Sequence, residues 1–365
     1  VWVIAMPMIM AANIGGTATL IGDPPNVIVG VAAPLTFMDF IYFLTVPVTF
    51  MMIALNYAAT WWYRRDLAGA SAQDGSDAEA IELAHPKVLK WTLAMIGLIF
   101  LGFFTHSLTH LPVGVIAFFG AGLVMAGRTV IHQREMSGKQ AEHAFTHAFE
   151  RGIEWLTLGF FIFLFMTISS AEHTGLIHSA ALKLQDAVDW VSAGLGLGLS
   201  AKLLTAALMI LVFSAVVSAL VDNIPYTIAA VAIVRVLVTS FAQELTGAGV
   251  ADPALAANVL WWALALGACL GGNATLIGAS ANVTTVGILE KDGHHMPFVD
   301  FLKVGIPTTL MTVFLAAIYL ILYVFVGAVE TNIGGAVVLG AFAAFALLRW
   351  RAGRPALRAR QSGYA

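Results

Sequence analysis

A polar stretch, NIGGTATLIGDPPNVIVG, interrupts an apolar segment near the start of the chain, between Asn13 and Gly30. Its Asp, Asn and Thr side chains offer oxygen ligands and one ionisable group, which suit a Na⁺ ion or a proton. Its glycines relax the backbone, and Pro24 and Pro25 remove two N–H donors, so we expect a helix to break here. Helix ends at such a break expose unpaired N–H and C=O groups that can bind an ion or a polar solute.

The chain contains a second copy of this stretch, GGNATLIGASANV, between Gly271 and Val283. Nine of its thirteen positions are identical to those between Gly15 and Val27. The main difference is that Asp23-Pro24-Pro25 is replaced by Ala279-Ser280-Ala281 in the second copy. Because one copy is acidic and rigid while the other is small and neutral, we expect the two copies to have different roles.

A third polar cluster, Asp222-Asn223-Ile224-Pro225, interrupts the long apolar segment from Ala201 to Ser240. We interpret this segment as a re-entrant hairpin whose tip points into the protein. Asp23 and Asp222 are the acids expected to lie deepest, and an acid at membrane depth must be paired, ion-bound or protonated. Such residues are functional-site hypotheses by default, although a purely structural role in capping half-helices is the alternative.

We predict that the three clusters meet near the middle of the membrane, where they would bind the substrate or a coupling ion. The predicted binding residues are Asn13, Gly15, Gly16, Thr17, Thr19, Gly22, Asp23, Pro24, Pro25, Asn26, Asp222, Asn223, Pro225, Thr227, Gly271, Gly272, Asn273, Thr275, Gly278, Ser280 and Asn282. Na⁺ is one candidate ion, with Asp222, Asn223 and Asn282 as candidate ligands. No catalytic residue and no cofactor are predicted apart from H⁺ or Na⁺ as the coupling ion.

The composition is that of a helical protein with many membrane crossings. Apolar residues make up 59% of the chain and charged residues 11%, against about 25% charged residues in soluble domains. The net charge of −3 and the lack of a basic stripe outside the loops argue against a nucleic-acid partner, so the expected partners are the lipid bilayer and a small inorganic ion or solute. The single cysteine, Cys269, excludes a disulfide within the chain.

We divide the chain into four regions. They are the C-terminal part of a first repeat (1–62, a broken helix plus a crossing), cytoplasmic loops with a two-helix insertion (63–151), a second repeat (152–327, a crossing, the hairpin, a broken helix and a crossing), and a last helix with a basic cytoplasmic tail (328–365). Polar loops are expected at 64–90 and 128–151. Because so little sequence precedes Gly15, we expect the N-terminal half of the first repeat to lie outside this chain.

The distribution of basic residues sets the expected orientation. Fifteen of the eighteen Lys and Arg residues fall at 64–90, at 128–151, at 291–303 and beyond residue 348, and the positive-inside rule places these segments in the cytoplasm. The hairpin must then enter and leave from the outside, so the two broken crossings run in opposite directions. The expected fold is an all-α polytopic inverted-repeat transporter with broken helices and a re-entrant hairpin. Its expected location is the plasma (inner) membrane, with a cytoplasmic C-terminus.

The two repeated stretches and the DNIP tip resemble the ArsB/NhaD ion transporter superfamily, most closely its branch of arsenite permease-like proteins and P protein. The GDPPN element is also similar to that of dicarboxylate/sodium symporters, which are more distant. The resemblance implies inverted repeats with two re-entrant hairpins, often in homodimers, and a transport domain that moves against a scaffold. It places Asp222-Asn223 at the second hairpin tip, and residues 22–26 and 278–282 at the unwound loops, while the first tip is absent.

One departure from the resemblance bears on the substrate. The dicarboxylate relatives have Ser-Asn-Thr at their tips, whereas this chain has Asp222-Asn223-Ile224, and an acidic tip repels a dianion at short range. We therefore expect a secondary active transporter coupled to H⁺ or Na⁺ that exports arsenite or antimonite or exchanges Na⁺ for H⁺. A sodium-coupled carboxylate or anion symporter and a passive channel remain alternatives. An enzyme is not expected, because the helices contain no catalytic arrangement of residues.

Overall fold

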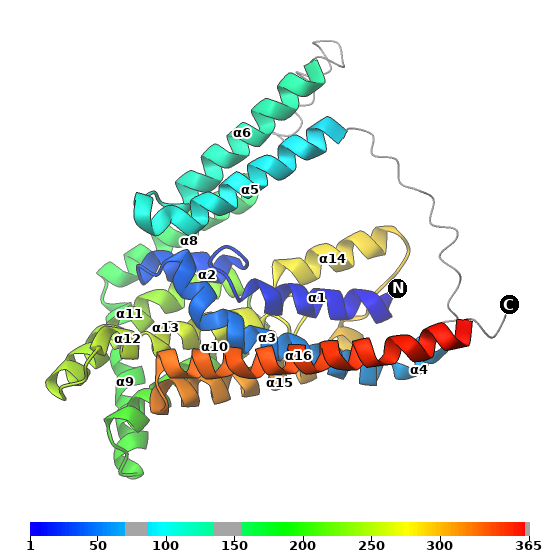
Figure 1. Cartoon of the computed structure of the whole chain (residues 1–365). Coiled ribbons are helices and arrows are strands. Elements are labelled where there is room, and N and C mark those ends of the chain that lie inside the picture. Colours follow the sequence, from blue (N-terminus) through cyan, green and yellow to red (C-terminus); the bar gives the residue numbers. More distant parts are fainter. Residues whose placement is uncertain (70–85, 134–154, 362–365) are drawn as a thin grey trace.

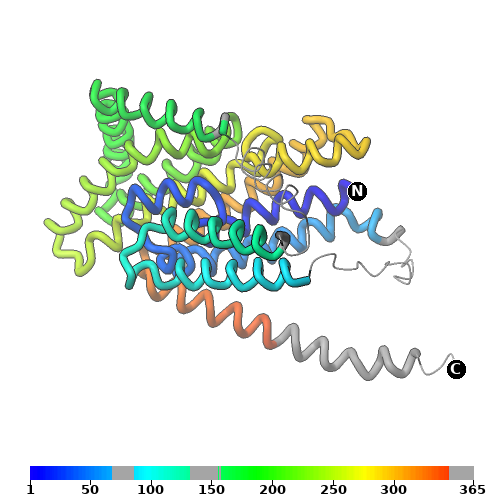
Figure 2. The backbone as a smooth tube through the Cα atoms, turned by 90° about the horizontal axis from the view of Figure 1, so that it is seen from above, coloured from blue at the N-terminus to red at the C-terminus, as the bar shows by residue number. Residues whose placement is uncertain are grey.

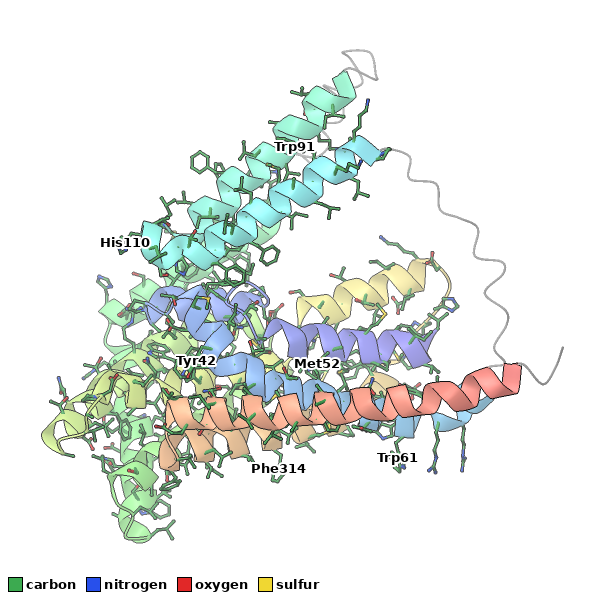
Figure 3. All side chains as sticks on the ribbon, viewed as in Figure 1. Tyr42, Met52, Trp61, Trp91, His110 and Phe314 are labelled. Atoms are coloured by element: carbon green, nitrogen blue, oxygen red, sulfur yellow. The ribbon has the colours of Figure 1, made fainter. Side chains whose placement is uncertain are left out.

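The structure, a computed structural model, describes residues 1–69, 86–133 and 155–361, and all regular structure within these ranges is helical. By length and composition, seven of the described helical segments can cross a membrane, or eight if the bent pair α8 and α9 forms one span. Large apolar side chains such as that of Phe314, which is 66% exposed, cover the outer faces (Figure 3). Such faces suit contact with lipid, and the chain is a multi-pass membrane protein.

The helices follow one another along the chain with short connections. They are α1 (Trp2–Gly16), α2 (Pro24–Ala32), α3 (Phe37–Trp62), α4 (Arg64–Gly69), α5 (Pro86–Thr109), α6 (Val113–Gln133), α8 (Trp155–His173), α9 (Leu176–Gly194), α10 (Leu199–Leu220), α11 (Asn223–Gly247), α12 (Pro253–Ala257), α13 (Val259–Gly271), α14 (Ser280–Lys291), α15 (Phe298–Phe325) and α16 (Ala328–Gln361). Figure 1 shows them in sequence colours.

Both predicted helix breaks are confirmed. The first helix ends at Gly16 and resumes as α2 at Pro24, because prolines are tolerated in a first turn whose N–H groups have no partner. The second break separates α13 from α14, with Ala279 in an extended conformation just before α14. The helices α1 and α14, which come from different copies, lie side by side (Figures 1 and 2).

The helices α10 and α11 form a hairpin that turns at Asp222, as predicted. At its open end, Lys202 Nζ on α10 lies 2.9 Å from Glu244 Oε2 on α11 and 2.8 Å from Asp189 Oδ1 on α9. This three-residue cluster joins both arms of the hairpin to α9. Each arm is long enough to cross a membrane by itself.

Three segments differ from the sequence prediction. The crossing expected to reach Ile177 ends at His173, where the chain bends by 70° into α9, a helix that we did not predict. The bend lies at Gly175, whose φ of 75° is in the left-handed region that favours glycine. The expected polar loops are shorter, because α4 and α5 take up both ends of the first and α6 extends to Gln133; residues 70–85 and 134–154 lie outside the described residues. The basic tail continues α16 as a helix to Gln361.

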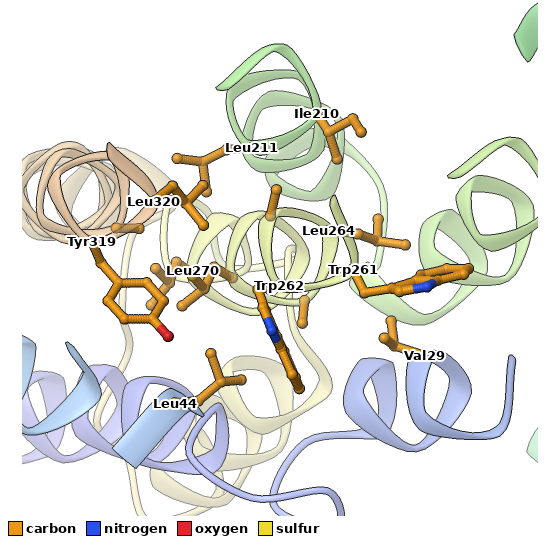
Figure 4. Close-up of a cluster of buried hydrophobic side chains, with 14 of the residues drawn as sticks. Val29, Leu44, Ile210, Leu211, Trp261, Trp262, Leu264, Leu270, Tyr319 and Leu320 are labelled. Atoms are coloured by element: carbon orange, nitrogen blue, oxygen red, sulfur yellow. The ribbon is translucent and has the colours of Figure 1, made fainter. Parts of the chain in front are cut away.

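The helix α13 forms the centre of the bundle, and every residue from Val259 to Gly271 is buried. Its sequence is apolar on all sides, as expected for a helix surrounded by other helices. Figure 4 shows Trp261 pointing toward Val29 of α2 and Trp262 toward Leu44 of α3. This core fixes the position of α13, and therefore of the second break, against the first broken crossing.

Candidate substrate and ion site

The two helix breaks meet inside the protein through three asparagines. Asn13 Nδ2 on α1 donates to Asn273 Oδ1 at 2.9 Å and to Asn282 Oδ1 at 2.8 Å. All three side chains are buried. The contacts join residues about 260 positions apart in the sequence, and they confirm the prediction that the two polar stretches lie together.

Each break is held by an equivalent asparagine. Asn26 Nδ2 donates to Thr17 O at 3.0 Å and to Thr19 O at 2.9 Å in the first loop. Asn282 Nδ2 donates to Gly272 O at 2.8 Å and to Thr275 O at 2.9 Å in the second. These amides satisfy carbonyl groups that the broken helices leave without a partner. The two loops therefore share one hydrogen-bond pattern as well as one sequence motif.

Glycine is required where each loop folds against itself. A Cβ atom on Gly16 would lie 2.6 Å from Gly22 O, and one on Gly22 would lie 2.3 Å from Gly16 O. The second loop has the same close approach, since a Cβ atom on Gly272 would lie 2.9 Å from Gly278 O. By contrast, a Cβ atom on Gly15 would meet nothing within 4 Å.

We expect Gly16→Ala to destabilise the protein by about 1 to 3 kcal/mol, because the new methyl group forces the loop backbone apart. The matched variant Gly15→Ala, one residue earlier, should be neutral or slightly stabilising, since alanine favours the helix. Thermal unfolding of both variants in detergent would measure the difference. Equal unfolding temperatures would contradict the close packing of the first loop.

The hairpin tip lies against the second loop. The backbone N–H of Asn223 donates to Gly278 O at 3.3 Å, and Thr275 Oγ1 donates to Ala219 O, near the end of α10, at 2.6 Å. Ser280 Oγ donates to Asp222 Oδ2 at 3.4 Å. The third predicted cluster thus joins the other two.

The two acids in this region have different environments. Asp222 is half-buried and caps α11, since its Oδ1 accepts a hydrogen bond from Ile224 N at 3.0 Å. Asp23 is only 8% exposed and makes no capping bond to α2, although it occupies the capping position. Its carboxylate lies next to the side chains of Cys269 and Asn223, yet within the described part of the chain Asp23 Oδ2 has no hydrogen-bond partner.

Two further polar atoms at the junction lack partners within the described ranges, namely Asn223 Nδ2 and Asn273 Nδ2. Both side chains are at least 98% buried. A buried polar group without a partner costs free energy and calls for an explanation such as a bound ion, solute or water. The arrangement combines one carboxylate oxygen with amide donors and loop carbonyls, which can hold a proton or a small cation beside a polar solute.

The structure does not bring every predicted site residue to this junction. Pro24 is exposed, and Thr227 uses its hydroxyl inside α11, where it donates to Asn223 O at 2.7 Å. Gly271 packs on the backbone of α10, where a Cβ atom would lie 2.5 Å from Ala215 O. The side chain of Asn282 is engaged in loop hydrogen bonds, so its role as a Na⁺ ligand stays a prediction.

Sequence reasoning did not include three residues that help to build the site. Cys269 Sγ donates to Asn26 Oδ1 at 3.4 Å, and Ser218 Oγ donates to Ala268 O at 2.6 Å. Gly305 lets α15 approach the second loop, since a Cβ atom there would lie 2.5 Å from Asn273 O. Ser218 could have been found from its small polar side chain, one turn before the hairpin tip. Cys269 offers no such signal, because its contact depends on how α13 packs on the first loop.

Broken membrane helices that meet at a buried polar site are typical of secondary transporters, and this is the class that the fold and site define. The chain belongs to the CitMHS citrate transporter family, whose model matches residues 2–267. This result confirms the resemblance to the ArsB/NhaD superfamily, and the protein is a membrane transporter rather than an enzyme.

Similar proteins include an uncharacterised transporter of Mycobacterium tuberculosis, which is 33% identical over 327 residues, covering 88% of this chain and 67% of the relative. The 46 kDa membrane protein of Mycobacterium leprae is 33% identical, covering 86% of this chain and 66% of the relative. The P protein of Sus scrofa is 34% identical over 63% of this chain and 24% of its own length. The chain thus spans about two thirds of the length of its bacterial relatives.

Proposed function

We propose that this protein is a secondary active transporter that couples the movement of a small solute to H⁺ or Na⁺, with Asp23 as the coupling carboxylate. The observation that carries the proposal is the unpartnered oxygen of buried Asp23 at the junction of the two loops and the hairpin tip. A carboxylate in this setting gains stability when it binds a proton or a cation. The energy of an ion gradient can therefore change the state of the site.

The proposed architecture is an inverted repeat with a re-entrant hairpin. The equivalent hydrogen bonds of Asn26 and Asn282 support a common origin of the two broken crossings. The tip of the hairpin lies against the break after α13, which favours a tip at membrane depth. With basic segments in the cytoplasm, the C-terminus faces inward, in a plasma (inner) membrane. A homodimer follows from the resemblance alone.

The structure alters the weight of the proposed substrates. Asp222 was expected to repel a dianion, but its two oxygens accept hydrogen bonds from Ile224 N and Ser280 Oγ, which offsets its charge. No side chain caps α14, whose first N–H groups suit an anion, whereas α2 begins with two prolines. Together with the description of the family, these features make a carboxylate such as citrate the first substrate to test. Arsenite or antimonite efflux and Na⁺/H⁺ exchange are the other candidates.

Reconstitution into vesicles tests this proposal. Purified protein is exposed in turn to an imposed pH gradient and to an imposed Na⁺ gradient, with labelled citrate, arsenite and Na⁺ as separate solutes. We expect one solute to accumulate against its own gradient only when one of these ion gradients is present. Solute movement that never exceeds equilibrium and ignores both gradients would favour the passive channel.

A further inference from the structure

A groove of about 460 Å³ lies between α3, α15 and α16, and none of the predicted site residues lines it. Figure 1 shows α16 running along α3 and α15 at the outside of the bundle. Most of the lining is apolar, including Val46, Phe50, Leu315, Ile318, Leu322 and Val338. An apolar groove on the lipid-facing side of a membrane protein has the chemistry of an acyl-chain site.

One end of the groove is polar. There the first turn of α16 contributes Glu330 and Thr331. Thr331 is 9% exposed, and its Oγ1 atom has no hydrogen-bond partner in the part of the chain that the structure describes. The same is true of Oδ1 of the neighbouring Asn332, which is 3% exposed. The carboxylate of Glu330 folds back over Gly327 at the start of the helix.

These atoms need hydrogen-bond donors. A carboxylate and an amide oxygen only accept hydrogen bonds, and a hydroxyl group can also accept. Glu330 is the one charged residue among those that line the groove, so this end carries a net negative charge. A ligand that fits must combine an apolar chain with a head that has a positive charge and N–H donors.

A glycine on α16 keeps the groove open. Gly334 lines the groove, and a Cβ atom added there would meet no other atom within 4 Å. Its neighbour Gly335 differs, because a Cβ atom there would lie 2.4 Å from a methyl carbon of Val46. Gly335 therefore allows α16 to pack closely on α3, and Gly334 leaves space beside that contact.

We propose that this groove binds a phospholipid with an ethanolamine headgroup. The acyl chain lies along Leu315, Ile318 and Leu322, and the ammonium group donates to the Glu330 carboxylate and to Thr331 Oγ1. A choline headgroup carries the same charge but has no N–H donor, and a glycerol headgroup has no positive charge. The chemistry of the polar end thus distinguishes ethanolamine lipids from both, independently of the transported solute.

Native mass spectrometry of purified protein tests the proposal. The protein is stripped of lipid and incubated with equal amounts of ethanolamine, choline and glycerol phospholipids that have identical acyl chains. We expect about a tenfold preference for the ethanolamine lipid, which is the effect of one hydrogen bond to a charged group. Gly334→Leu should reduce bound lipid by about tenfold, because the new side chain fills the groove.

Two controls make the outcome decisive. Gly340→Leu lies on the same helix, also points into open space and does not line the groove, so it should bind lipid like the wild type. Glu330→Gln combined with Thr331→Val should keep the acyl chain but lose the headgroup preference. Equal lipid binding by the wild type and Gly334→Leu would overturn the proposal. A change of oligomeric state in Gly334→Leu would also overturn it, by assigning the groove to a second copy of the chain.

Discussion

Replacing Asp23 with Asn is expected to lower gradient-driven transport to below about one hundredth of the wild-type rate, because an amide cannot exchange a proton or balance the charge of a cation at membrane depth. The protein should still fold, since the two side chains have nearly the same volume. In addition, Asp23 makes no capping hydrogen bond to α2 that the substitution could remove. Exchange of labelled for unlabelled solute at equal concentrations requires no net ion movement, so it should survive.

The measurement is the initial rate of solute accumulation in vesicles with an imposed pH or Na⁺ gradient. Asp300→Asn is the matched control, because Asp300 is exposed and its Oδ1 lies 2.6 Å from Lys303 Nζ at the start of α15. This control should transport at the wild-type rate, since exposed ion pairs contribute little. Full coupled transport by Asp23→Asn would show that Asp23 does not carry the coupling.

Asp222→Asn separates the roles of the two acids. Asparagine caps helices about as well as aspartate, so the variant should keep the start of α11 and most of its transport activity. The hydrogen bond that Ser280 Oγ donates to Asp222 Oδ2 is long, at 3.4 Å, and its loss should matter little. If Asp222→Asn stopped coupled transport while Asp23→Asn did not, the coupling group would lie at the hairpin tip.

The architecture of the site was predictable because its signals are local and repeated. Gly16, Gly22 and the pair Pro24-Pro25 break a helix wherever they occur in an apolar segment, and the second copy repeats both glycines at Gly272 and Gly278. Polar residues in such a segment must find partners inside the protein. The meeting of the three clusters therefore followed from the sequence before any contact was known.

The division of labour within the site could not be predicted in the same way. Asp23 and Asp222 look alike in sequence, and only the packing shows that one caps a helix while the other has a free oxygen. The predicted ion ligand Asn282 has its amide nitrogen committed to loop carbonyls. The helix α9 was missed because the apolar segment before it seemed to continue, whereas Gly175 turns the chain. These features depend on tertiary contacts, which propensity does not encode.

Replacing Asn26 or Asn282 with Ala is expected to destabilise the protein by about 2 to 4 kcal/mol, because each change leaves at least two buried carbonyl groups without a donor. Asn26→Ala removes the bonds to Thr17 O and Thr19 O and also the contact with Cys269. Asn282→Ala removes the bonds to Gly272 O and Thr275 O and also the one from Asn13. The two effects should be similar in size, because the two loops share one hydrogen-bond pattern.

Thermal unfolding in detergent would measure this loss as a decrease of roughly 5 °C in the midpoint temperature. Asn258→Ala provides the control, since Asn258 precedes α13 but makes no capping hydrogen bond through its side chain, and its substitution should change the midpoint little. A small effect in Asn26→Ala and a large one in Asn282→Ala would show that only the second loop is held by its asparagine. The first loop would then be free to change conformation, and the coupling carboxylate that ends it would move with that loop.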